Sequence, residues 1–280
     1  MNTSIPEIIL NDGVTIPAIG FGTYKLRGDA GANAIKSAID NGYRLIDTAY
    51  NYENEGAVGE AVKRSPVPRQ DLFITSKLPG RYHTYDLAVE AIQESLYRAN
   101  LDYYDLYLIH WPNPQQDHYV EAWQTLIEAR KWGLIRSIGV CNFLPEHLDR
   151  LETETGVKPS INQIELHPFF NQTTGREYHA ERDIQTQSWS PLAKANDILT
   201  NKTLRGIAER HQKTVSQVIL RWHYELGNIP IPKSASVTRQ RENLAIFDFA
   251  LDEQDIEKIA MLTTPDGRLN DQNPDVYEEF

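Results

Sequence analysis

The feature that most limits how this chain can fold is a regular alternation of short apolar runs with amphipathic stretches. The apolar runs are candidate strands, and they lie at 19–23, 43–47, 73–77, 105–110, 137–141, 161–166, 186–190 and 229–232. The stretches with helical spacing lie at 30–41, 56–64, 85–99, 119–132, 145–155 and 175–182, with two more within 202–226. Strand–helix alternation with short links predicts parallel βαβ units, in either an open doubly wound sheet or a closed barrel.

The length and continuity of the chain favour the closed barrel. No linker rich in Pro, Gly or Ser divides the 280 residues, so we expect a single α/β domain over 1–280. Eight strand–helix units in such a domain predict a (β/α)8 TIM barrel. Asn11-Asp12-Gly13 predicts the turn of an N-terminal β-hairpin. The polar C-terminal tail, 262–280, is expected to lie over one end of the barrel or to be partly disordered.

Charge and composition narrow the possible partners and location. The net charge of −11 and the pI near 5.2 argue against nucleic acid or an anionic membrane as a partner, because such surfaces need clustered Lys and Arg. No apolar stretch approaches the ~20 residues that span a bilayer. Residues 1–7 lack the basic and apolar regions of a secretory signal, and Cys141 has no second cysteine to pair with. We therefore expect a cytoplasmic protein.

Four polar residues occupy related positions in this pattern. Asp47, Lys77 and His110 close the second, third and fourth apolar runs, and Tyr52 follows Asp47 by five residues. Because the strands of a (β/α)8 barrel are parallel, their carboxyl ends share one rim, which is where active sites of this fold lie. Each residue alone has a structural explanation, as an ion pair, a packed aromatic or a buried histidine. Their joint order predicts a catalytic site.

The chemistry of these four groups suits proton transfer to a carbonyl oxygen. A tyrosine hydroxyl titrates near pH ~10, and a neighbouring ammonium such as Lys77 stabilises its ionised form. Asp47 would hold that ammonium charged, and His110 could donate a hydrogen bond to the same oxygen. Acid–base help of this kind contributes ~10²–10⁴ in rate. The set holds no nucleophile or metal, so the reducing power must come from a cofactor.

Several segments carry a family resemblance. They are 42–55, Lys77, 105–112 (DLYLIHWP), 138–143 (IGVCNF), 161–168 (INQIELHP) and 231–234 (IPKS). In this order and spacing the chain resembles the aldo-keto reductase family over about 5–268. Within that family it is most similar to bacterial diketogluconate-reductase-like members. The resemblance implies a (β/α)8 barrel that binds NADPH without a Rossmann domain, and a monomer.

The resemblance also implies a role for each matching residue. Tyr52 would be the general acid, His110 would orient the carbonyl, and Lys77 and Asp47 would tune the tyrosine. The implied cofactor contacts are Asn142 and Gln163 at the carboxamide, Trp189 under the nicotinamide ring, Lys233, Ser234 and Arg239 at the 2′-phosphate, and Glu242 and Asn243 near the adenine. Ser190, Pro191 and Leu192 are also implied cofactor contacts, and the Ala193–Asn196 loop is expected near the pyrophosphate. The implied substrate contacts are Tyr24, His110 and Trp111, with Asn113 beside them.

Two positions depart from the family pattern. Cys141 stands where a serine is usual, and a thiol is a weaker hydrogen-bond partner for the carboxamide. Pro79 stands where many relatives carry a tryptophan that walls the substrate pocket. We therefore expect a more open pocket on that side.

The function predicted is NADPH-dependent reduction of an aldehyde or ketone, such as a keto-sugar, an α-dicarbonyl or a small aldehyde. One alternative is a regulatory subunit that senses the cofactor on the same fold. Another is a hydrolase that pairs Asp47 with Glu165. A metal site is not expected, because the eight histidines show no His-Glu-x-x-His spacing. Gly20-Phe21-Gly22 begins a dinucleotide fingerprint, but Lys25 replaces its third glycine.

Overall fold

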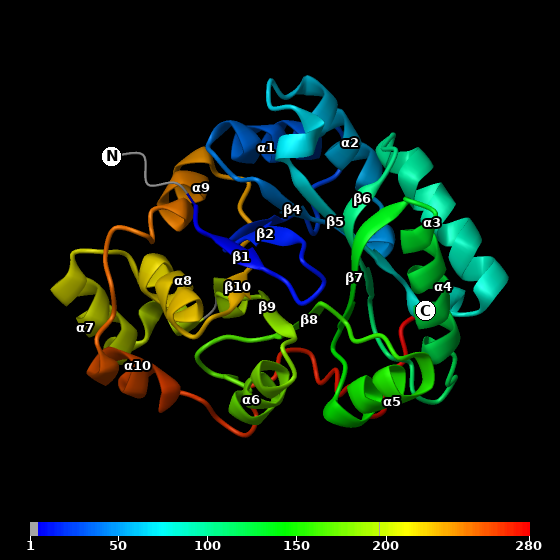
Figure 1. Cartoon of the computed structure of the whole chain (residues 1–280). Helices are drawn as coiled ribbons and strands as arrows, with labels where there is room; N and C mark the ends of the chain where they lie inside the picture. The colour runs from blue at the N-terminus through cyan, green and yellow to red at the C-terminus, as the bar shows by residue number, and fades with distance from the viewer. Residues whose placement is uncertain (1–4, 196) are drawn as a thin grey trace.

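The computed structural model describes residues 5–195 and 197–280, and its centre is a sheet of parallel strands paired in chain order. The strands are β3 (Gly20–Gly22), β4 (Leu45–Asp47), β5 (Phe73–Leu78), β6 (Tyr104–Ile109), β7 (Ile135–Cys141), β8 (Ile161–Glu165), β9 (Gln185–Trp189) and β10 (Ile229–Pro230). They coincide with the eight predicted strands, which are therefore confirmed (Figure 1).

The sheet closes on itself where β3 meets the end of β10. The backbone N–H of Gly22 donates to the carbonyl of Pro232 at 3.0 Å. A Cβ at Gly20 would lie 2.5 Å from Cδ1 of Ile231, so glycine permits this close approach of the first and last strands. The predicted (β/α)8 barrel is thus confirmed.

Helices form an outer ring around the strands (Figure 1). They are α1 (Gly28–Asp40), α2 (Glu55–Arg64), α3 (Tyr85–Ala99), α4 (Tyr119–Lys131), α5 (Pro145–Thr155), α6 (Thr173–Glu181), α7 (Lys202–His211), α8 (Val215–Glu225), α9 (Val237–Leu244) and α10 (Glu253–Ala260). The first eight confirm the predicted helices. α9 and α10 were not predicted, although Ser236 and Asp252 cap their first turns by accepting hydrogen bonds from Arg239 N and Asp255 N.

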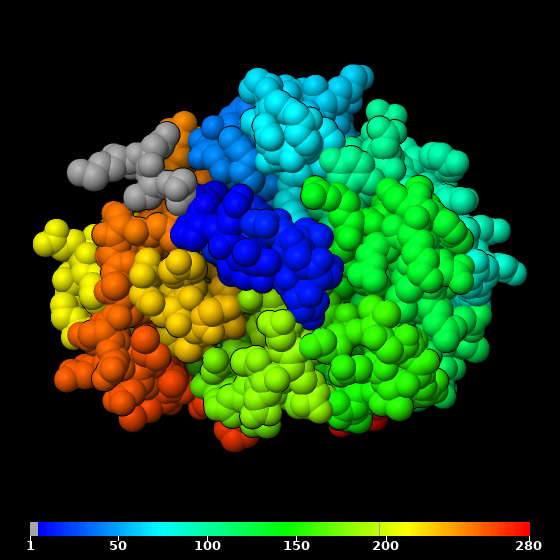
Figure 2. Space-filling model, viewed as in Figure 1, coloured from blue at the N-terminus to red at the C-terminus, as the bar shows by residue number. Residues whose placement is uncertain are grey.

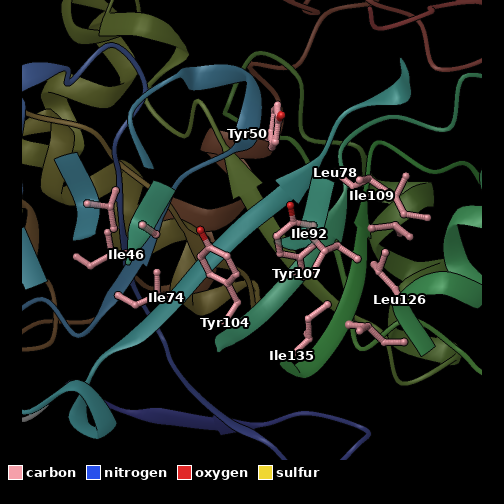
Figure 3. Packing of buried hydrophobic residues seen from close by; sticks show 14 of the residues in the cluster. Ile46, Tyr50, Ile74, Leu78, Ile92, Tyr104, Tyr107, Ile109, Leu126 and Ile135 are labelled. Carbon is pink, nitrogen blue, oxygen red and sulfur yellow. The ribbon is translucent and has the colours of Figure 1, made fainter. Parts of the chain in front are cut away.

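The strands are buried on both faces, which explains their continuous apolar runs. One layer packs side chains such as Ile46, Tyr107 and Ile109 against Ile92 of α3 and Leu126 of α4 (Figure 3). Neighbours of the opposite orientation, such as Leu45, point into the barrel and form a second cluster. The strand backbone is thereby held rigidly, which gives the residues at the strand ends fixed positions.

The N-terminal hairpin is confirmed and closes one end of the barrel. β1 (Glu7–Ile9) pairs with β2 (Thr15–Pro17), and Leu10 and Ile16 pack on the interior cluster. This hairpin lies across the middle of the face shown in Figure 2. The rim that carries the candidate site is at the opposite end, where the parallel strands finish. None of the described helices is both long and apolar enough to cross a membrane.

Gly59 is expected to be needed for the packing of α2 against α3. A Cβ at this position would lie 1.8 Å from the carbonyl oxygen of Ala99. Gly59→Ala should therefore lower the free energy of unfolding by about 1–3 kcal/mol, as overpacking usually does. Gly206→Ala is the control: the same added methyl in α7 meets nothing within 4 Å and should stabilise the protein by about 0.5–1 kcal/mol. Urea unfolding measures the free energy of unfolding of both variants. An equal change in the two variants would contradict the expected role of Gly59.

Candidate active site

The four residues predicted as catalytic meet at the carboxyl end of the barrel. Asp47 ends β4, Lys77 is the fifth residue of β5 and His110 directly follows β6. Tyr52 lies in η1 (Tyr50–Tyr52), a short 3-10 helix after β4. The ammonium of Lys77 lies 2.7 Å from Oδ1 of Asp47, and both side chains are buried. This ion pair forms the base of the site.

The aromatic ring of Tyr52 lies between the ion pair and the histidine. The Lys77 ammonium is 5.0 Å from the centroid of the Tyr52 ring, within cation–π range. The His110 ring meets the same tyrosine edge-on, with centroids 5.9 Å apart. The sequence prediction that these groups would come together agrees with this geometry.

Burial sets the protonation states of the tyrosine and the lysine. Burial raises the pKa of Tyr52 to about 12, and it outweighs the Lys77 ammonium, which lowers that pKa as the sequence analysis expected. Burial alone would lower the pKa of Lys77, but the Asp47 carboxylate raises it above its ordinary value. At neutral pH the site therefore holds a protonated tyrosine beside a charged lysine.

The residues expected at the nicotinamide are joined to this set by hydrogen bonds. Nε2 of Gln163 donates to Oδ2 of Asp47 at 2.8 Å and to Oε1 of Gln187 at 2.7 Å. Nε1 of Trp189 donates to Oδ1 of Asn142 at 2.8 Å. Sequence reasoning missed Gln187. The signal was available, because residues two apart on a strand share a face and Gln187 precedes Trp189 by two.

A loop with unusual backbone geometry follows β9. It contains Ser190, Pro191 and Leu192, and the carbonyl of Pro191 lies 3.3 Å from Nε2 of the buried His223. Ala193, Lys194 and Ala195 follow with φ of 45°, 57° and 57°. Three successive residues in the left-handed region give the loop a sharp fold. The last residue of the predicted pyrophosphate loop, Asn196, lies outside the described residues.

The predicted phosphate contacts lie at the start of α9. Lys233 and Arg239 are exposed, and in the part of the chain that the structure describes neither has an ion-pair partner. Ser234 is buried and its Oγ accepts a hydrogen bond from the N–H of Ser236. Two unpaired cations at a helix N-terminus suit a phosphate group, so these residues fit the 2′-phosphate of NADPH.

The two residues predicted near the adenine occupy the far end of the same helix. Glu242 accepts a hydrogen bond from Oγ1 of Thr214 at 2.7 Å, and Asn243 is buried. Glu242 is thus hydrogen-bonded to Thr214, the N-cap residue of α8, without any ligand. Its role toward an adenine stays a prediction.

The expected substrate contacts differ in their surroundings. Tyr24 is 52% exposed and meets Tyr52 edge-on, with centroids 5.1 Å apart. Trp111 is buried beneath Tyr277, with ring centroids 4.4 Å apart. Asn113 is fully buried, and its amide holds the backbone of Glu279. Its predicted place beside a substrate stays a prediction.

The C-terminal segment lies over this rim. This agrees with the first of the two expectations for the tail, that it covers one end of the barrel. Oε1 of Glu279 lies 2.7 Å from Nδ1 of His110 and accepts a hydrogen bond from Nδ2 of Asn51 at 2.8 Å. Oε2 accepts from the N–H of Gly80 at 3.2 Å. Gly80 directly follows Pro79, so the C-terminal segment contacts the chain next to the side of the pocket that was expected to be open. No pattern in the sequence pointed to Glu279.

Two other predictions have structural answers. Cys141 is buried at the end of β7, and burial raises the pKa of its thiol well above the ordinary value, so it is a protonated thiol. Glu165 accepts hydrogen bonds from the N–H of Leu269 at 2.6 Å and from Nε2 of His167 at 3.0 Å. It secures the C-terminal segment, and among the described residues no hydrogen bond joins it to Asp47.

Comparison with known proteins decides the family. The Aldo/keto reductase family model matches residues 18–263, which is most of the chain. This chain belongs to the aldo/keto reductase family. The family predicted from the sequence motifs is therefore confirmed.

Relatives of this aldo/keto reductase cover almost its whole length. The 2,5-diketo-D-gluconic acid reductase B of a Corynebacterium species is 51% identical over 277 residues, which is 99% of each chain. The methylglyoxal reductase DkgA of Escherichia coli is 45% identical over 274 residues, 97% of this chain and 98% of the relative. Among solved structures, a Gox0644 mutant in complex with NADPH has a TM-score of 0.94 and 41% identity, covering 99% of this chain and 100% of its own.

Proposed function

We propose that this aldo/keto reductase reduces aldehydes and ketones to alcohols with NADPH, with Tyr52 as the proton donor. The observation that carries the proposal is the buried Lys77–Asp47 pair against the ring of Tyr52, with His110 at the same ring. The solved relative that contains NADPH, and the relatives named as reductases of carbonyl compounds, support the same reaction.

The residues of this chain have separate tasks in the reaction. NADPH, when bound, would supply the hydride. Tyr52 gives its hydroxyl proton to the carbonyl oxygen as negative charge develops there, and the Lys77 ammonium stabilises the resulting tyrosinate. Asp47 keeps that ammonium charged and fixed in place. His110 orients the carbonyl by a hydrogen bond to the same oxygen, and the barrel end excludes water from the buried pair.

The cofactor preference is tested by Arg239→Ala. A hydrogen bond to a charged group contributes about 1.5–3 kcal/mol, so loss of the guanidinium should raise KM for NADPH by roughly one to two decades. NADH lacks the 2′-phosphate, so its KM should change little. Steady-state kinetics with both cofactors give the result.

A matched control for this variant lies on the same helix. Arg241 is exposed like Arg239, but its Nε donates to Asn41. Arg241→Ala should leave the ratio of the two KM values unchanged. An equal rise for NADPH and NADH in Arg239→Ala would overturn the assignment of the 2′-phosphate site.

The second candidate function, a cofactor-sensing regulatory subunit, gives a different result in a simple assay. A subunit that only binds the cofactor would quench protein fluorescence with NADPH and show no turnover of a reactive aldehyde. The intact set around Tyr52 favours the reductase.

A turnover screen of keto-sugars, α-dicarbonyls and small aldehydes would identify the preferred class of substrate. The monomeric state and the cytoplasmic location stay predictions.

A further inference from the structure

The two amide residues expected at the nicotinamide carboxamide already make hydrogen bonds within the protein. Oδ1 of Asn142 accepts from Nε1 of Trp189 at 2.8 Å, and its Nδ2 donates to the backbone carbonyl of His110 at 3.0 Å. Because Nδ2 carries two hydrogens, one N–H of Asn142 has no partner among the described residues. Asn142 can therefore donate one hydrogen bond to a bound group.

Gln163 has the opposite capacity. Its Nε2 donates one hydrogen to Oδ2 of Asp47 at 2.8 Å and the other to Oε1 of Gln187 at 2.7 Å. Both hydrogens of the amide are thus used, so Gln163 can offer a bound group only the acceptor Oε1. A carboxamide presents one carbonyl oxygen and one NH2 group. The donor of Asn142 and the acceptor of Gln163 together fit these two groups.

The direction of the Gln163 amide is set by its two partners. Asp47 is paired with Lys77 at 2.7 Å, and a carboxylate oxygen can only accept, so the NH2 group of Gln163 must face it. Gln187 must then present its oxygen to the same NH2 group, because a second NH2 group at 2.7 Å could not accept. The directions of both amides therefore follow from the carboxylate of Asp47.

The side chain of Gln187 is poorly suited to a role in packing alone. It is fully buried, and its own Nε2 is enclosed without a partner among the described residues. An enclosed amide without a partner is costly, so an apolar side chain of similar length would pack at this position with less loss. A glutamine here is explained if its oxygen has a task. In the described part of the chain, that oxygen accepts one hydrogen bond, from Gln163.

We propose that Gln187 is a positioning residue for the cofactor, which holds the amide of Gln163 with its oxygen toward the NH2 group of the nicotinamide carboxamide. The proposal rests on the proposed function, because it requires the nicotinamide to lie at Asn142 and Gln163. Without the oxygen of Gln187, one N–H of Gln163 loses its acceptor and the amide can turn. The hydrogen bond from the carboxamide NH2 group is then lost, which corresponds to about three- to tenfold in affinity.

Binding of NADP+ and of its 3-acetylpyridine analogue tests this role without any turnover. The analogue carries a methyl ketone in place of the carboxamide, so it keeps the oxygen and lacks the NH2 group. Isothermal titration calorimetry gives Kd of both compounds for the unmodified protein, Gln187→Met and Gln185→Met. Gln185 is the control on the same strand, because its Nε2 donates to the carbonyls of Thr186 and Gly227. We expect Kd to rise about three- to tenfold for NADP+ alone, and only in Gln187→Met.

The melting temperature separates this role from a structural one. Methionine fills a similar volume and removes the enclosed amide, so Gln187→Met should melt at the same temperature as the unmodified protein or higher. A lower melting temperature together with an equal rise in Kd for both compounds would show that Gln187 only supports the packing. An unchanged Kd for NADP+ would show that Asp47 alone directs the Gln163 amide. Either result overturns the proposal.

A second variant and the unmodified protein complete the test. Gln187→Leu removes the same acceptor if Gln187→Met does not fold, and the same change in the two Kd values is expected. An unmodified protein that binds neither compound would instead refute the proposed function.

Discussion

Replacing Tyr52 with phenylalanine is expected to remove nearly all turnover while NADPH binding persists. The change removes only the hydroxyl, so the ring can keep its contacts with Lys77 and His110. The lost group is the proposed proton donor, and such positioned acids contribute ~10²–10⁴ in rate. Turnover is followed by NADPH oxidation with a reactive aldehyde, and binding by quenching of protein fluorescence.

Tyr24→Phe is the matched control for this variant. Tyr24 also lies on the rim and touches the Tyr52 ring, but it is 52% exposed and has no place in the proposed proton transfer. Tyr24 is a predicted substrate contact, so loss of its hydroxyl should raise KM for the aldehyde and change kcat only a little. Near-normal turnover in Tyr52→Phe, or a collapse of similar size in Tyr24→Phe, would remove Tyr52 from its proposed role.

Replacing Lys77 with methionine is expected to damage both stability and activity. The change leaves the buried Asp47 carboxylate without its cation, with the Gln163 amide as its remaining side-chain partner. Breaking a buried ion pair in this way typically costs about 3–5 kcal/mol of unfolding free energy. Turnover should also collapse, because the tyrosinate loses the ammonium that stabilises it. Urea unfolding and the aldehyde assay measure the two effects separately.

The double variant Asp47→Asn, Lys77→Met separates the charge effect from packing. With both charges gone, much of the lost stability should return, while turnover should stay low. The more exposed pair Lys36–Asp40 on α1 is the comparison, since Lys36→Met should cost about 0–1 kcal/mol. Fully additive losses at Asp47 and Lys77 would show that the two charges do not depend on each other.

The barrel and the positions of the proposed catalytic residues could be predicted because both depend on local patterns. Each strand is an apolar run bounded by turn residues, and parallel strands necessarily bring Asp47, Lys77 and His110 to one rim. α9 and α10 were missed because they are short and strongly polar, so their apolar spacing is weak. Their N-cap residues, Ser236 and Asp252, are of types that favour the start of a helix, and they indicate both helices in the sequence.

The contacts of the C-terminal segment could not be predicted in this way. Asn113 and Glu279 are 166 positions apart, and no periodic pattern connects them. An asparagine after a strand is a candidate substrate contact, and nothing in the sequence indicates that its amide also binds the backbone of Glu279. The net pKa of Tyr52 was also beyond the sequence, because Lys77 and burial act in opposite directions and their balance depends on the packing.

The attachment of the C-terminal segment to the rim has a practical consequence for anyone who produces this protein. An affinity tag fused after Phe280 would begin two residues beyond Glu279, at the rim of the barrel that carries the candidate site. Such a fusion can displace the Glu279 backbone from its two hydrogen bonds with Asn113. The measured kinetics would then change although the proposed catalytic residues are the same. A tag before the N-terminal hairpin enters at the other end of the barrel, and it is the better choice for assays of substrate preference.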